Sequence, residues 1–185
     1  VPPNLMQRRV AVDVRQARRF GNWSGMGAGK TLSAVLATRV VGSNLPVICC
    51  PNAVVKGWRD ELMNSFSGCD VAEKTWSPSW SDPLATMPRY LIMNYEQFQQ
   101  PDSEGNLVAF LERNVVDFVV IDEIHYAKQR DVGAEMSQRK RLVQGLVLEG
   151  LQFRDNVALR ALQGLAAQIV GGNRLRLGAA DFEVI

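Results

Sequence analysis

Three short apolar runs set the strongest limit on how this chain can fold. They are Pro46–Cys50, Tyr90–Met93 and Val115–Ile121. Segments with a helical pattern, 52–66 and 107–114, lie between them. Strands that are apolar throughout are typical of parallel sheets, because helices cover both faces of such sheets. The pattern therefore predicts an α/β fold, with a mostly parallel sheet and helices on both faces.

The rest of the chain fits one domain spanning residues 1–185, since 185 residues suffice for a single full-sized core. Helices are expected at 4–19, 31–41 and 133–150, a short strand at Phe20–Trp23, and an edge strand at Ala72–Trp76. Residues 156–165 are ambiguous between strand and helix.

Composition excludes several classes of protein. Apolar residues make up 46% and charged residues 22%, as in ordinary globular proteins, and the net charge of +2 alone indicates no partner. No apolar run approaches the roughly 20 residues that span a membrane. Cys49 and Cys50 are adjacent, which is poor geometry for a disulfide or a metal site. Together with Cys69 they are interpreted as reduced, and a cytoplasmic protein without membrane contact is expected.

The segment Gly25-Met26-Gly27-Ala28-Gly29-Lys30-Thr31 is a candidate phosphate loop. Glycines let the backbone curl so that several N–H groups face one anion, and the following helix adds the positive end of its dipole. In this pattern Gly25, Gly27, Ala28 and Gly29 wrap the phosphates and Lys30 neutralises their charge. The Thr31 hydroxyl is expected to bind Mg²⁺, so the predicted ligand is ATP with Mg²⁺.

One position departs from the full Walker pattern, which has glycine where Ser24 stands. The shorter form Gly-x-Gly-Lys-Thr is satisfied by Gly27–Thr31. Glycines also cap helices and form hinges, so a glycine-rich turn alone would be weak support. A strand before the loop and a helix after it favour phosphate binding.

Two acids follow the apolar run that ends at Ile121. Asp122 at a strand end can hold Mg²⁺, directly or through water, and Glu123 can polarise the attacking water. Taken alone, such acids would more simply cap a helix. Their occurrence together with the phosphate loop favours catalysis. His125, the only histidine, would lie beside the γ-phosphate and could report nucleotide state, although a lone histidine is usually structural.

Asp122-Glu123-Ile124-His125 resembles motif II of superfamily 2 helicases and translocases. Other segments occur in the matching order. Leu5-Met6-Gln7 resembles the upstream glutamine motif and Ser24–Thr31 resembles motif I. Pro46–Trp58, with Cys-Pro at a strand end and a Trp on the next helix, is similar to motif Ia of the Swi/Snf-like branch. Leu91–Glu96 is similar to its Ib region, so the resemblance covers about residues 5–130.

This resemblance implies a RecA-like P-loop NTPase domain, the first lobe of a helicase. It implies that Gln7 reads adenine and that Lys30, Asp122, Glu123 and His125 serve catalysis. Motifs Ia and Ib touch nucleic acid in this family, which implies contacts from Pro51, Asn52, Lys56, Asn94 and Tyr95. Each has a simpler alternative: Pro51 and Asn52 make a good helix start, Lys56 can be merely solvated, and Tyr95 can simply pack.

Two departures limit the resemblance. Motif III normally carries hydroxyls and a proline, whereas the best register here, Gly164–Val170, has neither. A complete motor also has a second RecA-like lobe that supplies arginine fingers, and that lobe is expected to be absent from this chain. Arg139, Lys140 and Arg141 are interpreted as a helix face.

Three hypotheses follow. The first is the ATP-binding lobe of a DNA translocase or helicase, which hydrolyses ATP when a second lobe is present in cis or in trans. The second is a regulatory or interaction module that binds nucleotide without motor activity. The third is another P-loop ATPase, such as an RNA helicase-like lobe or an AAA+ protein.

Overall fold

The computed structural model describes residues 2–17, 19–25, 27–77, 87–126 and 137–148. All of them belong to the first of the two units into which the chain divides, Val1–Phe153. The second unit, Arg154–Ile185, lies outside the described residues, and so do the ambiguous segment 156–165 and the motif III register.

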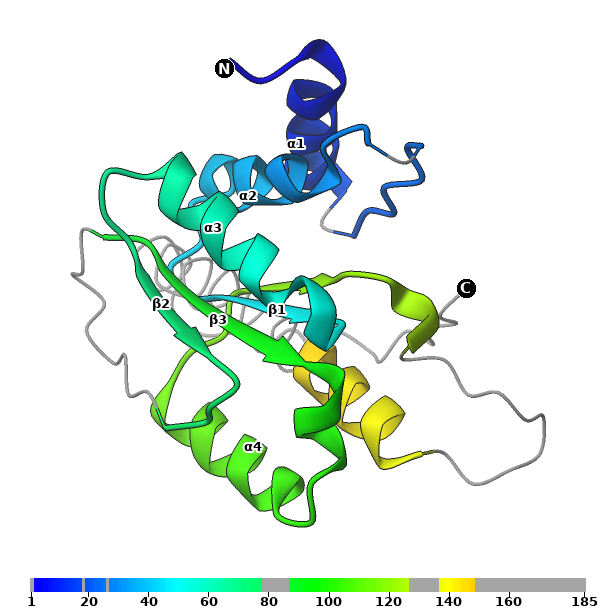
Figure 1. Ribbon diagram of the computed structural model, residues 1–185, viewed down its shortest axis with the longest axis vertical. Coiled ribbons are helices and arrows are strands. Elements are labelled where there is room, and N and C mark those ends of the chain that lie inside the picture. Colours follow the sequence, from blue (N-terminus) through cyan, green and yellow to red (C-terminus); the bar gives the residue numbers. More distant parts are fainter. Residues whose placement is uncertain (1, 18, 26, 78–86, 127–136, 149–185) are drawn as a thin grey trace, which may run out of the picture. The chain divides into compact units, whose positions relative to one another are not determined.

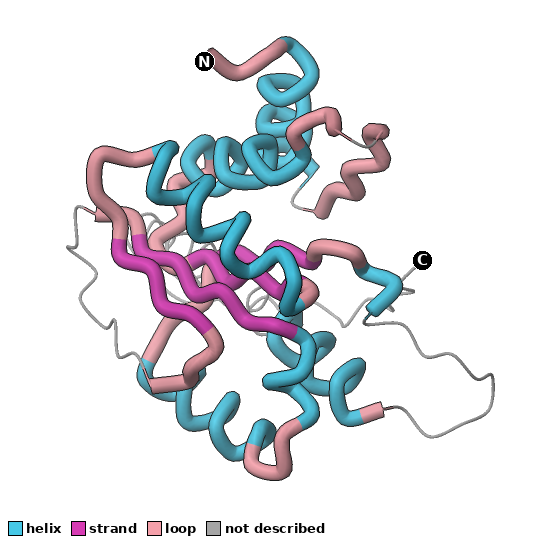
Figure 2. The backbone as a smooth tube through the Cα atoms, viewed as in Figure 1, coloured by secondary structure: helices cyan, strands magenta, loops and turns pink. Residues whose placement is uncertain are grey.

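The described residues contain one sheet of four parallel strands (Figures 1 and 2). Its order is β2-β3-β1-β4, and the strands are β1 (Pro46–Cys50), β2 (Asp70–Glu73), β3 (Arg89–Asn94) and β4 (Phe118–Ile121). Since parallel strands end at the same edge, the residues after Cys50, Asn94 and Ile121 gather along one side of the sheet. The predicted α/β class with a parallel sheet is confirmed.

Helices cover both faces of the sheet. Figure 1 shows α2 (Lys30–Val40) and α3 (Val55–Ser65) on one side, and α4 (Ser103–Arg113) with the helix at 138–148 on the other. Successive side chains of β1 point to opposite faces. Val47 and Cys49 therefore pack on the α4 side, while Ile48 and Cys50 pack on the α3 side. This double burial explains why the strand is apolar at every position.

The remaining helices are short or lie apart from the sheet. α1 (Leu5–Ala17) packs against α2 rather than on a strand. Three 3₁₀ turns follow strands: η1 (Asn52–Val54), η2 (Tyr95–Gln99) and η3 (Ile124–Tyr126). None of the described helices is long and apolar enough to cross a membrane.

The predicted strand at Phe20–Trp23 is wrong. This segment has no regular structure, and the exposed fractions of Phe20 and Trp23 are 43% and 85%. A strand in a covered parallel sheet must bury its side chains, and these two are exposed. The candidate phosphate loop therefore connects α1 to α2.

Two other strand predictions are shifted. β4 begins at Phe118 rather than Val115, because the carboxylate of Asp117 turns back to the loop before β1. It accepts hydrogen bonds from Ser43 Oγ at 2.5 Å and from the Leu45 backbone N–H at 3.1 Å. β2 ends at Glu73, before Trp76, whose ring is buried edge-on against Phe98.

The cysteines give a direct test of this core. All three are free; Cys49 and Cys50 are buried, and Cys69 is partly exposed. Burial, then repulsion from Asp122, raises the pKa of Cys50 to about 12, and burial raises the pKa of Cys49 strongly.

Because only thiolates react readily, an aromatic disulfide reagent at pH 8 should modify Cys69 alone in the folded chain and all three thiols in denaturant. Cys69→Ser should abolish the native reaction; two reactive thiols in the folded wild type would contradict this packing.

Candidate functional site

The glycine loop contains two residues with left-handed backbones. Gly27 and Gly29 have left-handed backbones, with φ of 74° and 75°, and Gly29 is the N-cap of α2. The Ala28 backbone N–H donates to the Gly25 carbonyl at 3.4 Å. Met26 lies outside the described residues. Glycine is the residue that tolerates such backbones without strain, so the two positions explain the composition of the loop.

Lys30 reaches back over its own loop. Its Nζ donates to the carbonyl oxygens of Ser24 and Gly25, at 3.1 Å each. Both acceptors are neutral, so the positive charge of the lysine is not paired with a carboxylate in this arrangement. Thr31, the next residue of α2, is half-buried in its first turn. A cation and backbone N–H groups at a helix start together form an arrangement suited to an anion.

Gln7 links α1 to this loop through a hydrogen bond. It forms a capping box with Asn4: Asn4 N donates to Gln7 Oε1 at 2.8 Å, and Gln7 N donates to Asn4 Oδ1 at 2.9 Å. Gln7 Nε2 donates to the Gly29 carbonyl at 3.4 Å. A Cβ atom on Gly29 would lie 2.4 Å from Gln7 Nε2, so the end of the Gln7 side chain would have to move, whereas the left-handed backbone itself favours glycine.

Asp122 is held by three elements at the end of β4. Its N–H donates to the Cys49 carbonyl at 2.8 Å, which continues the pairing with β1. The Trp58 indole N–H from α3 donates to Asp122 Oδ2 at 2.9 Å, and the Tyr95 hydroxyl donates to the Asp122 carbonyl at 2.6 Å. Burial, followed by repulsion from Cys49 and Asp122, raises the pKa of Tyr95, so its hydroxyl stays protonated and keeps donating.

The second acid is more open. Glu123 has a left-handed backbone, with φ of 54°, which is uncommon for a residue other than glycine. Its carboxylate lies 3.2 Å from His125 Nδ1, and both side chains are more than half exposed. This exposure leaves the pair accessible to water.

The predicted magnesium donors, Asp122 and Thr31, are oxygen groups on two different elements. Within the described ranges the Asp122 carboxylate accepts one hydrogen bond, from Trp58 to Oδ2, and none at Oδ1. No group of three His, Cys, Asp or Glu side chains gathers in the described part of the chain. Magnesium commonly uses one or two carboxylates together with substrate phosphates and water. Asp122 and Thr31 carry oxygen donors of the kind that magnesium uses, and their joint binding of one ion stays a prediction.

The loop and the acid pair are linked indirectly. No hydrogen bond or ion pair between described residues joins Lys30 to Asp122 or Glu123. Instead, Val35 of α2 and Trp58 of α3 lie in the same buried cluster, and Trp58 bonds Asp122. The predicted union of loop and acid pair in one nucleotide site stays a prediction.

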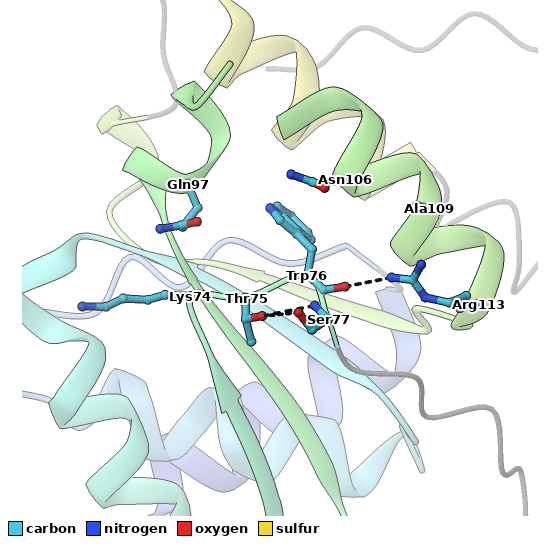
Figure 3. Close-up of a pocket in the computed structure, with 8 residues that line it drawn as sticks. All are labelled: Lys74, Thr75, Trp76, Ser77, Gln97, Asn106, Ala109 and Arg113. Atoms are coloured by element: carbon cyan, nitrogen blue, oxygen red, sulfur yellow. Dashed lines mark hydrogen bonds between the residues drawn. The ribbon is translucent and has the colours of Figure 1, made fainter. Parts of the chain in front are cut away.

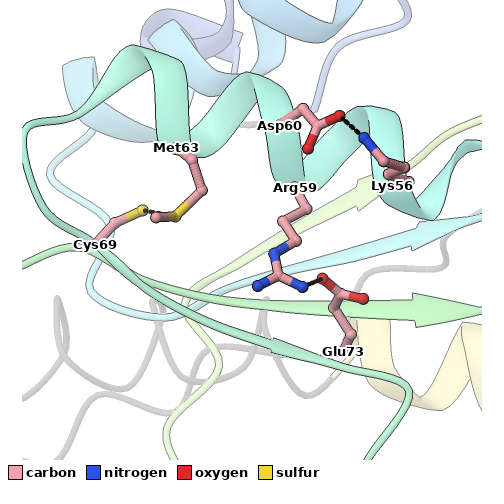
Figure 4. A network of polar contacts seen from close by, with 6 residues as sticks. All are labelled: Lys56, Arg59, Asp60, Met63, Cys69 and Glu73. Carbon is pink, nitrogen blue, oxygen red and sulfur yellow. Dashed lines mark hydrogen bonds and ion pairs between the residues drawn. The ribbon is translucent and has the colours of Figure 1, made fainter.

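The predicted nucleic-acid residues divide into exposed and buried groups. Pro51 precedes η1 and Asn52 is exposed in its first position. Lys56 is exposed and forms an ion pair with Asp60 of the same helix (Figure 4). In contrast, the exposed fractions of Asn94 and Tyr95 are 4% and 0%. Asn94 Nδ2 donates to Glu96 Oε2 at 2.8 Å, so burial favours structural roles for these two, and their contacts with nucleic acid stay predictions.

Sequence reasoning missed the residues that support the acids. Trp58 was singled out only as part of the segment that is similar to motif Ia. Tyr126 and Arg139 were given no role at the site. A Trp in a predicted helix does indicate that an acceptor lies nearby in the fold, since a buried indole N–H needs a hydrogen-bond partner. Nothing in the local sequence names Asp122, 64 positions away, as that acceptor.

A separate pocket of about 350 Å³ lies between the segment after β2, η2 and α4 (Figure 3). Its walls come from residues 74–77, from Gln97, and from Asn106, Ala109 and Arg113 of α4. Arg113 Nη2 donates to the Trp76 carbonyl at 3.0 Å across it. None of the loop or acid-pair residues lines this pocket, so it is not the candidate nucleotide site.

The fold and these residues define a class. A parallel sheet covered on both faces, with a glycine loop at a helix start and acids at a strand end, is a RecA-like, helicase-like ATP-binding domain of superfamily 2. A family model described as type III restriction enzyme, res subunit, matches residues 3–147, and the chain therefore belongs to that family. Comparison with curated proteins gives no match. The Swi/Snf-like branch stays a prediction.

Trp58→Phe should weaken magnesium-dependent nucleotide binding. The change keeps an aromatic ring in the core but removes the hydrogen bond to Asp122, and hydrogen bonds to charged groups contribute roughly 1.5–3 kcal/mol. Titration with a fluorescent ATP analogue in Mg²⁺ should give a dissociation constant about ten times higher. Trp76→Phe, a buried Trp on the opposite face of the sheet, is the control and should leave binding unchanged. Equal behaviour of both variants would contradict the role of Trp58.

Proposed function

We propose that this chain binds ATP with Mg²⁺ and is the first lobe of a nucleic-acid-dependent ATPase. The observation that carries the proposal is the loop at the start of α2, where Lys30 Nζ bridges the carbonyls of Ser24 and Gly25 beside two left-handed glycines. An entering phosphate would exchange these two neutral acceptors for charged oxygens. Such charge-assisted bonds are about twice as strong as neutral ones.

The acids would complete the chemistry. With ATP in the loop, Asp122 and Thr31 would hold the ion, and Glu123 would orient the water that attacks the γ-phosphate in line. The openness of Glu123 supports this role, since its carboxylate is more than half exposed. His125, whose Nδ1 lies 3.2 Å from the Glu123 carboxylate, would then sense whether the γ-phosphate is present. Bound magnesium would supply charge neutralisation of the β- and γ-phosphates.

Adenine recognition by Gln7 belongs to the same proposal. Gln7 lies next to the loop, yet its oxygen is engaged by Asn4 and its amide by Gly29. Those contacts also support a purely structural role. Gln7→Ala separates the two, because a structural residue would change ATP and GTP binding equally, whereas a base-reading residue would change ATP binding alone.

Full catalysis would require a partner lobe. Arginine fingers are worth about a thousandfold or more in comparable phosphoryl transfers. The isolated chain would therefore bind nucleotide and hydrolyse it slowly. A second RecA-like lobe, in cis or in trans, would supply the missing charge.

The proposed polymer is DNA, as in the Swi/Snf-like branch. Asn52 and Lys56 are exposed just after β1, at the edge of the sheet where Asp122 also lies, which supports contact with a phosphate backbone there. Stimulation of the two-lobe protein by duplex DNA, single-stranded DNA and RNA can be compared directly. Stimulation by RNA alone would replace this proposal with an RNA helicase-like lobe.

A second candidate is a nucleotide-binding regulatory module without motor activity. The sequence Gly164–Val170 favours it, because it lacks the hydroxyls and proline that couple hydrolysis to movement in the resembling motors. In that case the two-lobe protein would bind ATP, but nucleic acid would not stimulate hydrolysis.

Lys30→Ala should abolish most nucleotide binding, since it removes a cation that lies over the loop. We expect the dissociation constant for ATP to rise at least about tenfold. Isothermal titration with and without Mg²⁺ measures this change. Lys140→Ala, which removes a half-exposed lysine on the helix at 138–148, should bind as wild type. Unchanged binding by Lys30→Ala would disprove the phosphate loop.

Glu123→Gln should separate binding from hydrolysis. The amide keeps the size of the side chain but is a poor base, so ATP binding should persist while turnover in the two-lobe protein falls by about a hundredfold or more. Phosphate release measures turnover and analogue titration measures binding. Full turnover in this variant would remove Glu123 from the mechanism.

A further inference from the structure

Arg139, on the helix at 138–148, contacts the two 3₁₀ turns η2 and η3. Its guanidinium carbon lies 5.9 Å from the centre of the Tyr95 ring. Its Nη1 donates to the Tyr126 carbonyl at 3.1 Å, and its Nη2 donates to Gln99 Oε1. One side chain thus contacts η2, through the Tyr95 ring and Gln99, and η3, through Tyr126.

The two tyrosines carry these contacts to the acids. Their rings are parallel, 5.8 Å apart with 3° between planes. The Tyr95 hydroxyl donates to the Asp122 carbonyl at 2.6 Å, and the Tyr126 N–H donates to the Glu123 carbonyl at 2.9 Å. Arg139 is therefore connected to each acid through one intervening residue, Tyr95 for Asp122 and Tyr126 for Glu123.

The turn that carries the acids needs such support. Glu123 has a left-handed backbone that a residue with a Cβ adopts only when its surroundings impose it. The turn is exposed from Glu123 to Tyr126, so little burial holds it in place. Hydrogen bonds to its carbonyls, supplied from the side of η2 and the helix at 138–148, are what fix it.

The other cations of this helix do not share these contacts. Arg141 Nη2 pairs with Glu104 of α4 at 2.7 Å, in the open, and both side chains are 55% exposed. Arg139 instead contacts an aromatic face, a carbonyl and an amide oxygen, and none of these partners is an acid. A planar guanidinium can stack on a ring and donate in its plane at once, which an ammonium cannot.

We propose that Arg139 is a positioning residue for the Asp122–Glu123 pair, acting through the Tyr95–Tyr126 stack. The inference rests on the proposed role of that pair in binding magnesium with ATP. It assigns to the helix at 138–148 the task of holding the magnesium carboxylate and the water-orienting carboxylate in register. Without Arg139 the turn would sample other backbone conformations, and the metal-dependent part of nucleotide binding would weaken.

The test compares ATP-analogue binding to the whole chain in Mg²⁺ and in EDTA. Arg139→Met keeps the aliphatic stem and should raise the dissociation constant in Mg²⁺ by about three- to tenfold. Affinity in EDTA, which depends on the loop, should not change. Arg139→Lys keeps the charge but loses the planar donors, so it should recover only part of the loss. Arg141→Met is the control and should match wild type in both conditions.

Tyr95→Phe tests the same route without altering Arg139. It removes only the hydroxyl that bonds Asp122, and it should weaken binding in Mg²⁺ but not in EDTA. Thermal unfolding shows whether Arg139→Met is folded. If it is not, Arg139→Lys and Tyr95→Phe decide the outcome. Equal losses in Mg²⁺ and EDTA, or no loss in either, would overturn the inference.

Asp122→Asn distinguishes this inference from the proposed function. If Asp122→Asn removes the Mg²⁺ dependence while Arg139 and Tyr95 variants keep it, only the positioning role fails. If wild type and Asp122→Asn bind equally with and without Mg²⁺, the proposed role of the acid pair itself fails.

Discussion

The attachment of Asp122 at the end of β4 is the contact on which the rest of the site depends. Its backbone continues the pairing of β4 with β1, its carboxylate accepts the Trp58 indole N–H, and its carbonyl accepts the Tyr95 hydroxyl. These donors come from elements on both faces of the sheet, since Trp58 packs in one core cluster and Tyr95 in the other. The acid is therefore fixed by the same packing that holds the two helical layers to the strands.

The glycine loop is organised on a different basis. It carries no strand before it within the described residues, and it is held instead by α1, through Gln7 and the Gly29 carbonyl, and by its own lysine. The exposed aromatic side chains of Phe20 and Trp23 agree with a segment that is not part of the sheet. Loop and acids thus have separate supports, and it is the proposed function that joins them through a bound nucleotide.

Much of the fold follows from local patterns. The runs at Pro46–Cys50 and Tyr90–Met93 predict buried strands because both faces of a parallel strand are covered, and the structure contains both. The strand predicted at Phe20–Trp23 is absent because aromatic residues favour strands only where a neighbouring surface buries them. β4 starts late because Asp117 bonds the loop before β1, a contact that no window of the sequence contains.

The sequence by itself determined the class of the fold, the glycine loop and the acid pair, because each depends on residues adjacent along the chain. Gly27 and Gly29 allow left-handed backbones wherever they occur, and carboxylates after an apolar run lie at a strand end. Only the tertiary structure decided which side chains hold those acids. Trp58, Tyr95 and Arg139 reach Asp122 and its turn across helix–sheet contacts, and such long-range contacts are set by the packing of whole elements rather than by neighbouring residues.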